Sequence, residues 1–245
     1  MRQRWLVIAG LLAFFMGALA IFPARVAYSW FAPPEVALAG IEGSIWRGSA
    51  DHASISGVYV RNIEWTTRPF SLFLLRPSFN ARGELMSGFV EGIFGVGLGN
   101  RIVMKDVSAS VSLDSLAQSV SIPQLEGTAN LRLDTLDIRD GLPVAATGTI
   151  EVADLFAPTI YRSSPIGGYR AEFFTQEDGI VASVEDTDGI VEVAGSLTVS
   201  SDRSYVFLAA IAPKPGADEG LREQMRFLGT PDERGQYELR LEGTL

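Results

Sequence analysis

The sequence predicts a mainly β protein: one N-terminal transmembrane helix, then a curved, mostly antiparallel β-sheet domain with one or two short helices. Two observations lead to this prediction. Residues 5–22 form an uninterrupted apolar run with basic residues on both sides. Most of the chain after residue 36 alternates apolar and polar residues, which is the pattern of strands that bury one face and leave the other in water.

The apolar run, from Trp5 to Phe22, is long enough to cross a membrane as a helix. Its eighteen residues would rise roughly 27 Å, close to the ~30 Å hydrocarbon core. A helix also satisfies the backbone polar groups, which lipid cannot do. Arg2 and Arg4 precede the run, and the positive-inside rule keeps that end in the cytoplasm. Residues 1–25 are therefore expected to be a single-pass anchor.

A cleaved signal peptide is the alternative for the same run. Ala18-Leu19-Ala20 has the small-x-small form of a cleavage site. The apolar segment continues through Ile21 and Phe22, which is longer than a usual signal core and favours an uncleaved anchor. Both alternatives place the residues from about 30 onward across the membrane.

The rest of the chain is acidic and has no cysteine. Beyond residue 25, seventeen Lys and Arg stand against twenty-nine Asp and Glu, a net charge of −12. Such a domain repels phosphate backbones, so nucleic acid is not an expected partner. Without cysteine there is neither a disulfide nor a thiolate metal site.

Two prolines and the start of apolar–polar alternation divide the rest of the chain into a linker and a β domain. Residues 26–35 contain Pro33 and Pro34 and predict a short, stiff linker. The β domain then covers residues 36–245. A likeness between Gly43-Ser-Ile-Trp and Gly148-Thr-Ile-Glu suggests two related halves, with bounds 36–140 and 141–245.

Strands are predicted wherever apolar and polar residues alternate. Asp-Gly pairs at 140–141, 178–179 and 188–189 favour tight turns between them. The clearest alternating segments are 58–65, 107–113, 129–138, 191–199, 205–207 and 237–241.

One soluble helix is predicted near the C-terminus. Asp218 can cap a helix over 219–228, which Gly229 would end. Its apolar residues, at i, i+4 and i+7, are Leu221, Met225 and Leu228. Residues 115–120 favour another short helical turn.

No constellation of catalytic or metal-binding residues stands out. His52 is the only histidine, which excludes multi-histidine metal sites and leaves a single base for any Ser-His-Asp arrangement. The segment 185–192 resembles a calcium loop, but its closing acid follows Gly189 by three places instead of six. The glycine-rich segment 88–99 lacks the Lys-Ser/Thr ending of a phosphate loop. We therefore expect no catalytic residue, no metal and no cofactor.

Large apolar side chains are the candidates for an interaction surface. Trp46 and Trp65 lie beside turn glycines, where such rings usually fill a core; alternatively, they line an apolar groove or a partner surface. The candidate interaction or groove surface consists of Trp46, Trp65, Phe70, Leu72, Phe89 and Phe94.

Several motifs resemble those of a known family, type II secretion system protein N (general secretion pathway protein N). The N-terminal motifs are Gly43-Ser-Ile-Trp-Arg-Gly-Ser-Ala, Gly57 and Ile63-Glu-Trp65 followed by Pro69. The C-terminal motifs are Leu228-Gly-Thr-Pro-Asp232, Gly235-Gln-Tyr237 and Gly243. The chain departs from the family where Glu151 and Val152, instead of a tryptophan, follow Gly148-Thr-Ile, and this weakens the two-halves hypothesis.

The resemblance implies a bitopic inner-membrane protein with a cytoplasmic N-terminus and a periplasmic C-terminal domain. It implies an accessory, non-enzymatic component of the machine that exports folded proteins, acting by contact with other type II secretion components. The alternative is a module that binds or transfers lipid in an apolar groove of the curved sheet. The two differ in whether the inward face of the sheet is packed or open along its length.

Overall fold

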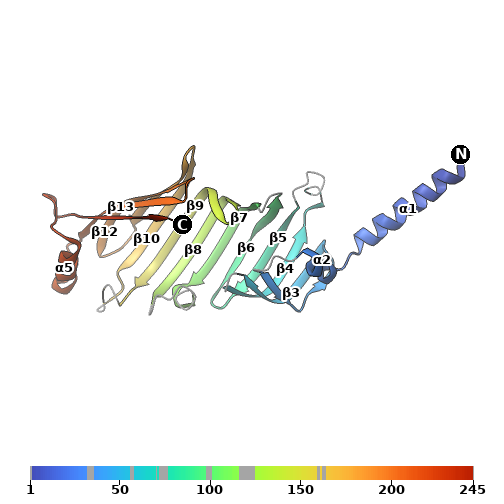
Figure 1. Cartoon of the computed structure of the whole chain (residues 1–245). Helices are drawn as coiled ribbons and strands as arrows, with labels where there is room; N and C mark the ends of the chain where they lie inside the picture. The colour runs from blue at the N-terminus through green and yellow to red at the C-terminus, as the bar shows by residue number, and fades with distance from the viewer. Residues whose placement is uncertain are drawn as a thin grey trace.

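One long antiparallel sheet makes up most of the protein (Figure 1). The computed structural model describes residues 2–31, 36–55, 58–69, 71, 77–97, 101–115, 125–158, 161 and 164–244. The strands are β1 (Val36–Ala39), β2 (Glu42–Gly43), β3 (Arg47–Ile55), β4 (Val58–Thr67), β5 (Ser78–Leu85), β6 (Gly88–Gly97), β7 (Arg101–Ser112), β8 (Glu126–Arg139), β9 (Leu142–Phe156), β10 (Gly167–Gln176), β11 (Gly179–Asp186), β12 (Val191–Ser200), β13 (Ser204–Pro213) and β14 (Tyr237–Thr244). The helices are α1 (Arg2–Ala20), α2 (Ala24–Phe31), α5 (Glu219–Met225) and the 3₁₀ helix η1 (Arg226–Leu228).

The sheet is a meander in which strands pair in chain order from β3 to β14. The outer edge at the N-terminal end is β1, which pairs with β3, and the short β2 also pairs with β3. This confirms the predicted antiparallel architecture. Asp140 and Gly141 form the two-residue turn between β8 and β9, with φ of 50° and 79°, as the Asp-Gly pair predicts. The proposed division at residue 140 thus falls inside a continuous sheet.

The N-terminal region is helical. Residues predicted to form the anchor lie in α1, but among the described residues no helix is long and apolar enough to cross a membrane. Ala24–Phe31 form α2, which overlaps the predicted proline-containing linker at residues 26–31. No proline interrupts these residues, and Pro23 directly before them suits a helix start. Pro33 and Pro34 lie outside the described residues.

The predicted C-terminal helix is confirmed. Asp218 caps α5 by accepting a hydrogen bond of 2.8 Å from the backbone N–H of Leu221. The helix continues into η1, which ends at Gly229 with φ of 127°. Of the second predicted helical segment, 115–120, only Ser115 is described.

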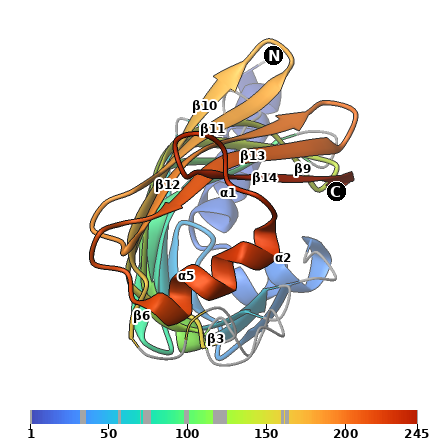
Figure 2. The same ribbon diagram turned by 90° about the vertical axis from the view of Figure 1, so that its left-hand side faces the viewer.

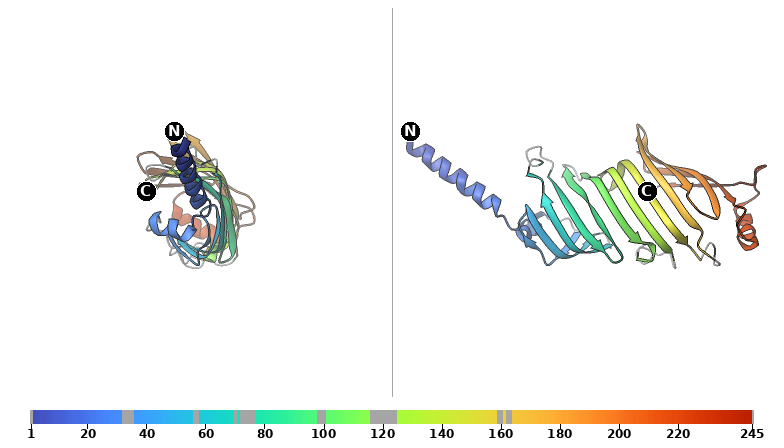
Figure 3. Two further views of the ribbon diagram at one scale, coloured as in Figure 1. Left: turned by 90° about the vertical axis from the view of Figure 1, so that its right-hand side faces the viewer. Right: turned by 180° about the vertical axis from the view of Figure 1, so that it is seen from behind.

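The sheet bends about its long axis into a trough. Seen along that axis, the strands follow an arc, with α5 at the near end and α2 at the far end inside the hollow (Figure 2). From behind, the convex side consists of strands lying side by side (Figure 3).

A packed core is present beneath α5. Leu221, only 2% exposed, and Met225 pack there with side chains from the last strands and their connections. The cluster consists of Ala157, Tyr161, Ile166, Val191, Ala217, Leu221, Met225 and Tyr237. Burial of the apolar face of α5 therefore holds the helix in the end of the trough.

We predict that Leu221→Ala lowers the free energy of unfolding by about 2–4 kcal/mol, because it leaves a cavity in this cluster. Urea unfolding of the detergent-solubilised full chain measures the change. Phe227→Ala is the matched control: Phe227 is 90% exposed, and exposed substitutions usually cost less than ~0.5 kcal/mol. Equal stability of the two variants would contradict this packing.

Candidate functional site: an apolar trough

The register of the strands gives the sheet one apolar face and one polar face. In β8, Leu131 and Leu133 lie on one face, and Asn130 and Arg132 lie exposed on the other. Leu131 is opposite Ala109 of β7 and Ile150 of β9, so neighbouring strands continue the apolar side. Further residues of the same face, along the sheet, are Trp65, Phe94, Phe173, Leu197 and Phe207.

The apolar face lines the hollow. Leu221 and Met225 of α5 pack with Val191 and Tyr237, which lie on the apolar face of β12 and β14. Because α5 lies inside the arc (Figure 2), the concave face is the apolar one. We call this concave apolar face, from β3 to β14, the trough.

The trough is long and uncovered in its middle. From β3 to β14, eleven steps between twelve consecutive strands, at ~4.8 Å each, give a length of about 53 Å. The helices lie at its two ends, and no described helix lies over β5–β10 (Figure 1). The larger side chains Phe94, Ile150 and Phe173 are accordingly half-buried. Smaller side chains of the same face, Val107, Leu133 and Ala146, are buried between their neighbours. In the described residues, the inward face is open along its middle.

Aromatic side chains occupy the N-terminal part of the trough. Phe79 and Phe94 stack across β5 and β6, with ring centroids 6.0 Å apart and an interplanar angle of 21°. The ring of Trp65 lies over Gly48 of β3, where an added Cβ would lie 2.4 Å from Trp65 Cζ2. Trp65 Nε1 donates a hydrogen bond of 3.3 Å to the Ser44 carbonyl.

Four of the six sequence candidates are described by the structure, and they lie on different parts of the sheet. Trp65 and Phe94 lie in the trough. Phe89 is five residues before Phe94, so alternation puts it on the opposite face, where it is 45% exposed. Trp46 lies before β3, and its Nε1 donates a hydrogen bond of 2.8 Å to the Leu19 carbonyl of α1. Phe70 and Leu72 lie outside the described residues.

Most of the trough lining was not singled out from the sequence, although alternation was visible there. In some strands β-bulges also change the phase of the alternation. In β8, Leu133 pairs with Gly148 and Leu136 pairs with Ala146, so the extra residue Asp134 lets two leucines three apart share a face. The presence of such a bulge depends on the neighbouring strand.

A small polar group interrupts the trough near α5. Tyr169 is opposite Asp186, and burial, with the nearby charges of Asp186 and Asp188, raises the pKa of Tyr169 to about 12. Burial alone would raise the pKa of Asp186, but hydrogen bonds from Lys214 and from the N–H of Val193 hold it below its usual range. The acid is thus neutralised by an ion pair, a structural arrangement.

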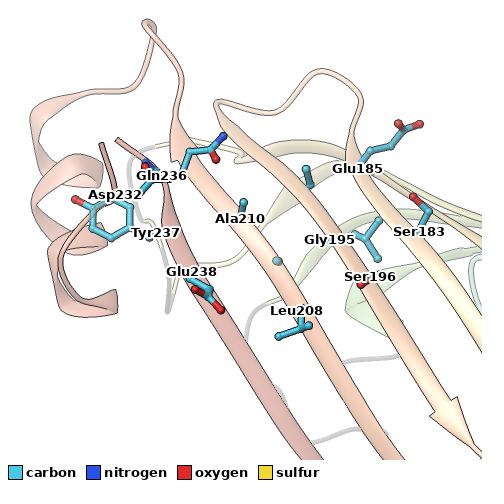
Figure 4. A pocket seen from close by; sticks show the side chains of 13 residues that line it. Ser183, Glu185, Gly195, Ser196, Leu208, Ala210, Asp232, Gln236, Tyr237 and Glu238 are labelled. Carbon is cyan, nitrogen blue, oxygen red and sulfur yellow. The ribbon is translucent and has the colours of Figure 1, made fainter. Parts of the chain in front are cut away.

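The polar face offers no comparable site. A shallow hollow crosses β11–β14 there (Figure 4), with Glu185, Asp232 and Glu238 among its lining residues and no basic side chain. His52 is exposed on β3 opposite Arg61. Among the described residues, no three His, Asp or Glu side chains gather where they could hold a metal ion.

Comparison with known proteins identifies relatives over the whole chain. A family model described as "Type II secretion system (T2SS), protein N" matches residues 34–240. The type II secretion system protein N of Aeromonas hydrophila is 25% identical over 254 aligned positions, covering all of both chains. That of Vibrio cholerae serotype O1 is 26% identical over 233 positions and covers 91% of each. No solved structure matches this chain.

We predict that a cysteine in the middle of the trough is accessible to a small apolar thiol reagent. The chain has no cysteine of its own, so single-cysteine variants can be compared directly. Ile150→Cys should react quickly in the folded, delipidated protein, and Leu221→Cys, under α5, only on unfolding. If Ile150→Cys reacts as slowly as Leu221→Cys, the trough is closed in solution.

Proposed function

We propose that this chain, which belongs to the type II secretion system protein N family, is a non-enzymatic accessory component of that system. It is anchored in the inner membrane by its N-terminal segment, and its sheet acts in the periplasm by contact with other components. The observation that carries this proposal is the open apolar trough. A long uncovered apolar face favours binding over chemistry.

The character of α1 supports the membrane anchor. Its apolar side chains, among them Trp5, Phe14 and Phe15, are exposed, and the uncharged run continues past the helix to Phe22. Exposed apolar side chains in such a number are stable in lipid and not in water. The hydrogen bond from Trp46 to the end of α1 then ties the sheet to the anchor.

The uncovered apolar lining of the trough also favours a second function, lipid binding. Its lining is apolar over many successive strands, its outer face is polar, and one end lies next to the proposed anchor. An acyl chain needs apolar contact without specific polar partners, which this surface provides. The trough would then shelter the acyl chains of a membrane lipid.

Loss of the chain is expected to reduce export of type II secretion substrates or the cellular levels of other components. Complementation in a deletion strain, with a secreted substrate measured in the medium, tests this. A form in which a cleavable signal peptide replaces residues 1–25 should fail to complement, and the mature full-length chain should retain Arg2 and Arg4. Unchanged secretion and component levels in the deletion strain would refute the proposal.

Lipid binding is tested by gentle extraction followed by mass spectrometry of bound lipid. Leu131→Lys places a charge in the trough, and Asn130→Lys, its neighbour in β8, places the same charge on the outer face. We expect Leu131→Lys to lose most of the lipid and Asn130→Lys to keep it. Absence of lipid from the unsubstituted protein would rule out this second function and leave the first.

A further inference from the structure

The two outer edges of the sheet differ. At the N-terminal end, the edge strand β1 has only four residues. The Tyr28 hydroxyl of α2 donates a hydrogen bond of 2.9 Å to the Val36 carbonyl and accepts one of 3.0 Å from the Leu38 N–H. The hydroxyl thus satisfies a carbonyl and an amide of β1 that do not face β3. This edge is closed to another strand.

The edge at the C-terminal end is open. β14 has eight residues and, among the described residues, pairs with β13 alone. Among the described residues, the backbone of Glu238–Thr244 makes no hydrogen bond to any segment other than β13. Its alternation continues that of the sheet: Leu239 and Leu241 lie on the trough face, and Glu238 and Arg240 on the outer face.

Exposed apolar side chains lie beside this edge. Phe227 and Leu228 of η1 are 90% and 44% exposed, and η1 contacts β14. Leu241 of β14 is 50% exposed. Single exposed apolar residues are ordinary, but here Phe227 and Leu228 lie on an element that contacts β14, and Leu241 lies further along the same strand, so exposed apolar side chains accompany the unpaired backbone. Strand addition uses both features: unpaired backbone groups for hydrogen bonds and apolar side chains for contact.

We propose that β14 binds an extended segment of a different protein, which adds a strand to the sheet and prolongs the trough. The bound strand carries apolar residues at alternate positions, which cover Leu241 and Phe227. Its other side faces two acids, Glu238 and Glu242, and one base, Arg240, so basic or neutral polar residues suit it.

The closed edge at β1 and the proposed anchor together exclude a second copy of this chain as the segment that pairs with β14. Because the anchor is part of the proposed function, this exclusion rests on that function. Tyr28 prevents β14 of one copy from pairing with β1 of the next. β14 faces away from the N-terminal end, twelve strand spacings or about 58 Å along the sheet from β1. In the proposed function, copies anchored side by side by residues 5–22 have sheets that extend away from the membrane, so their β14 edges face in the same direction and do not pair with each other.

A photo-reactive amino acid at position 238, 240 or 242 of the full-length chain tests the proposal in cells that contain the other secretion components. We expect an adduct with one protein. In a strand pair, each step of two residues along β14 should move the crosslinked position by two residues along one partner segment. The matched control positions are Ala37 and Ala39 of β1, where we expect no adduct. An adduct of the chain with itself, crosslinks without this stepping, equal adducts from β1, or none at all would overturn the proposal.

A variant separates specific binding from loss of fold. Phe227→Ala combined with Leu241→Ala should lower the adduct from position 240 at least ~10-fold, equivalent to about 1.4 kcal/mol, with an unchanged thermal midpoint. An unchanged adduct would refute the role of these side chains. If the deletion strain fails to export but the stepped crosslinks are absent, strand addition is wrong and the proposed function stands. If export is normal in the deletion strain, the proposed function itself fails.

Discussion

The register of the hydrogen-bonded strands is the constraint on which the rest of the structure depends. Successive side chains of a strand point to opposite faces, so one slipped residue would exchange the two faces of that strand. In β7, β8 and β9 the register keeps Ala109, Leu131 and Ile150 in a row. Where a residue is inserted, as at Asp106 with φ of 48°, the strand absorbs it as a bulge and its apolar residues return to the same face.

A sheet with one apolar face normally covers that face with a second layer. In the part of the chain that the structure describes, helices cover only the two ends: α5 packs through Leu221 and Met225, and α2 contacts the edge strand β1 through Tyr28. Uncovered apolar surface is unfavourable by ~25 cal/mol per Å². The described part of the chain leaves this surface uncovered. An apolar ligand that covers it would therefore gain its binding free energy by removing the surface from water.

The sequence indicated the architecture better than the site. Alternation was enough to predict an antiparallel sheet, and Asp218 with Gly229 was enough to predict α5, since both are local signals. The grouping of side chains was not local. Alternation alone separates Phe89 from Phe94, which are five residues apart in β6, but Leu133 shares a face with Leu136 only because of a bulge opposite β9. A bulge is decided by how two strands pair, which single-strand periodicity does not report.

The two edge strands of the sheet, β1 and β14, differ in whether their outer backbone groups are hydrogen-bonded. A meander must end in two edge strands, and each exposes unpaired backbone. At β1, the Tyr28 hydroxyl of α2, which directly follows α1, takes the place of a neighbouring strand. At β14, by contrast, the exposed backbone adjoins Phe227, which is almost fully exposed. An edge that needed only protection from aggregation would have no reason to carry an exposed aromatic ring beside it. The closed edge therefore lies next to α1 and α2, and the open edge, with exposed apolar side chains beside it, lies at the other end of the sheet.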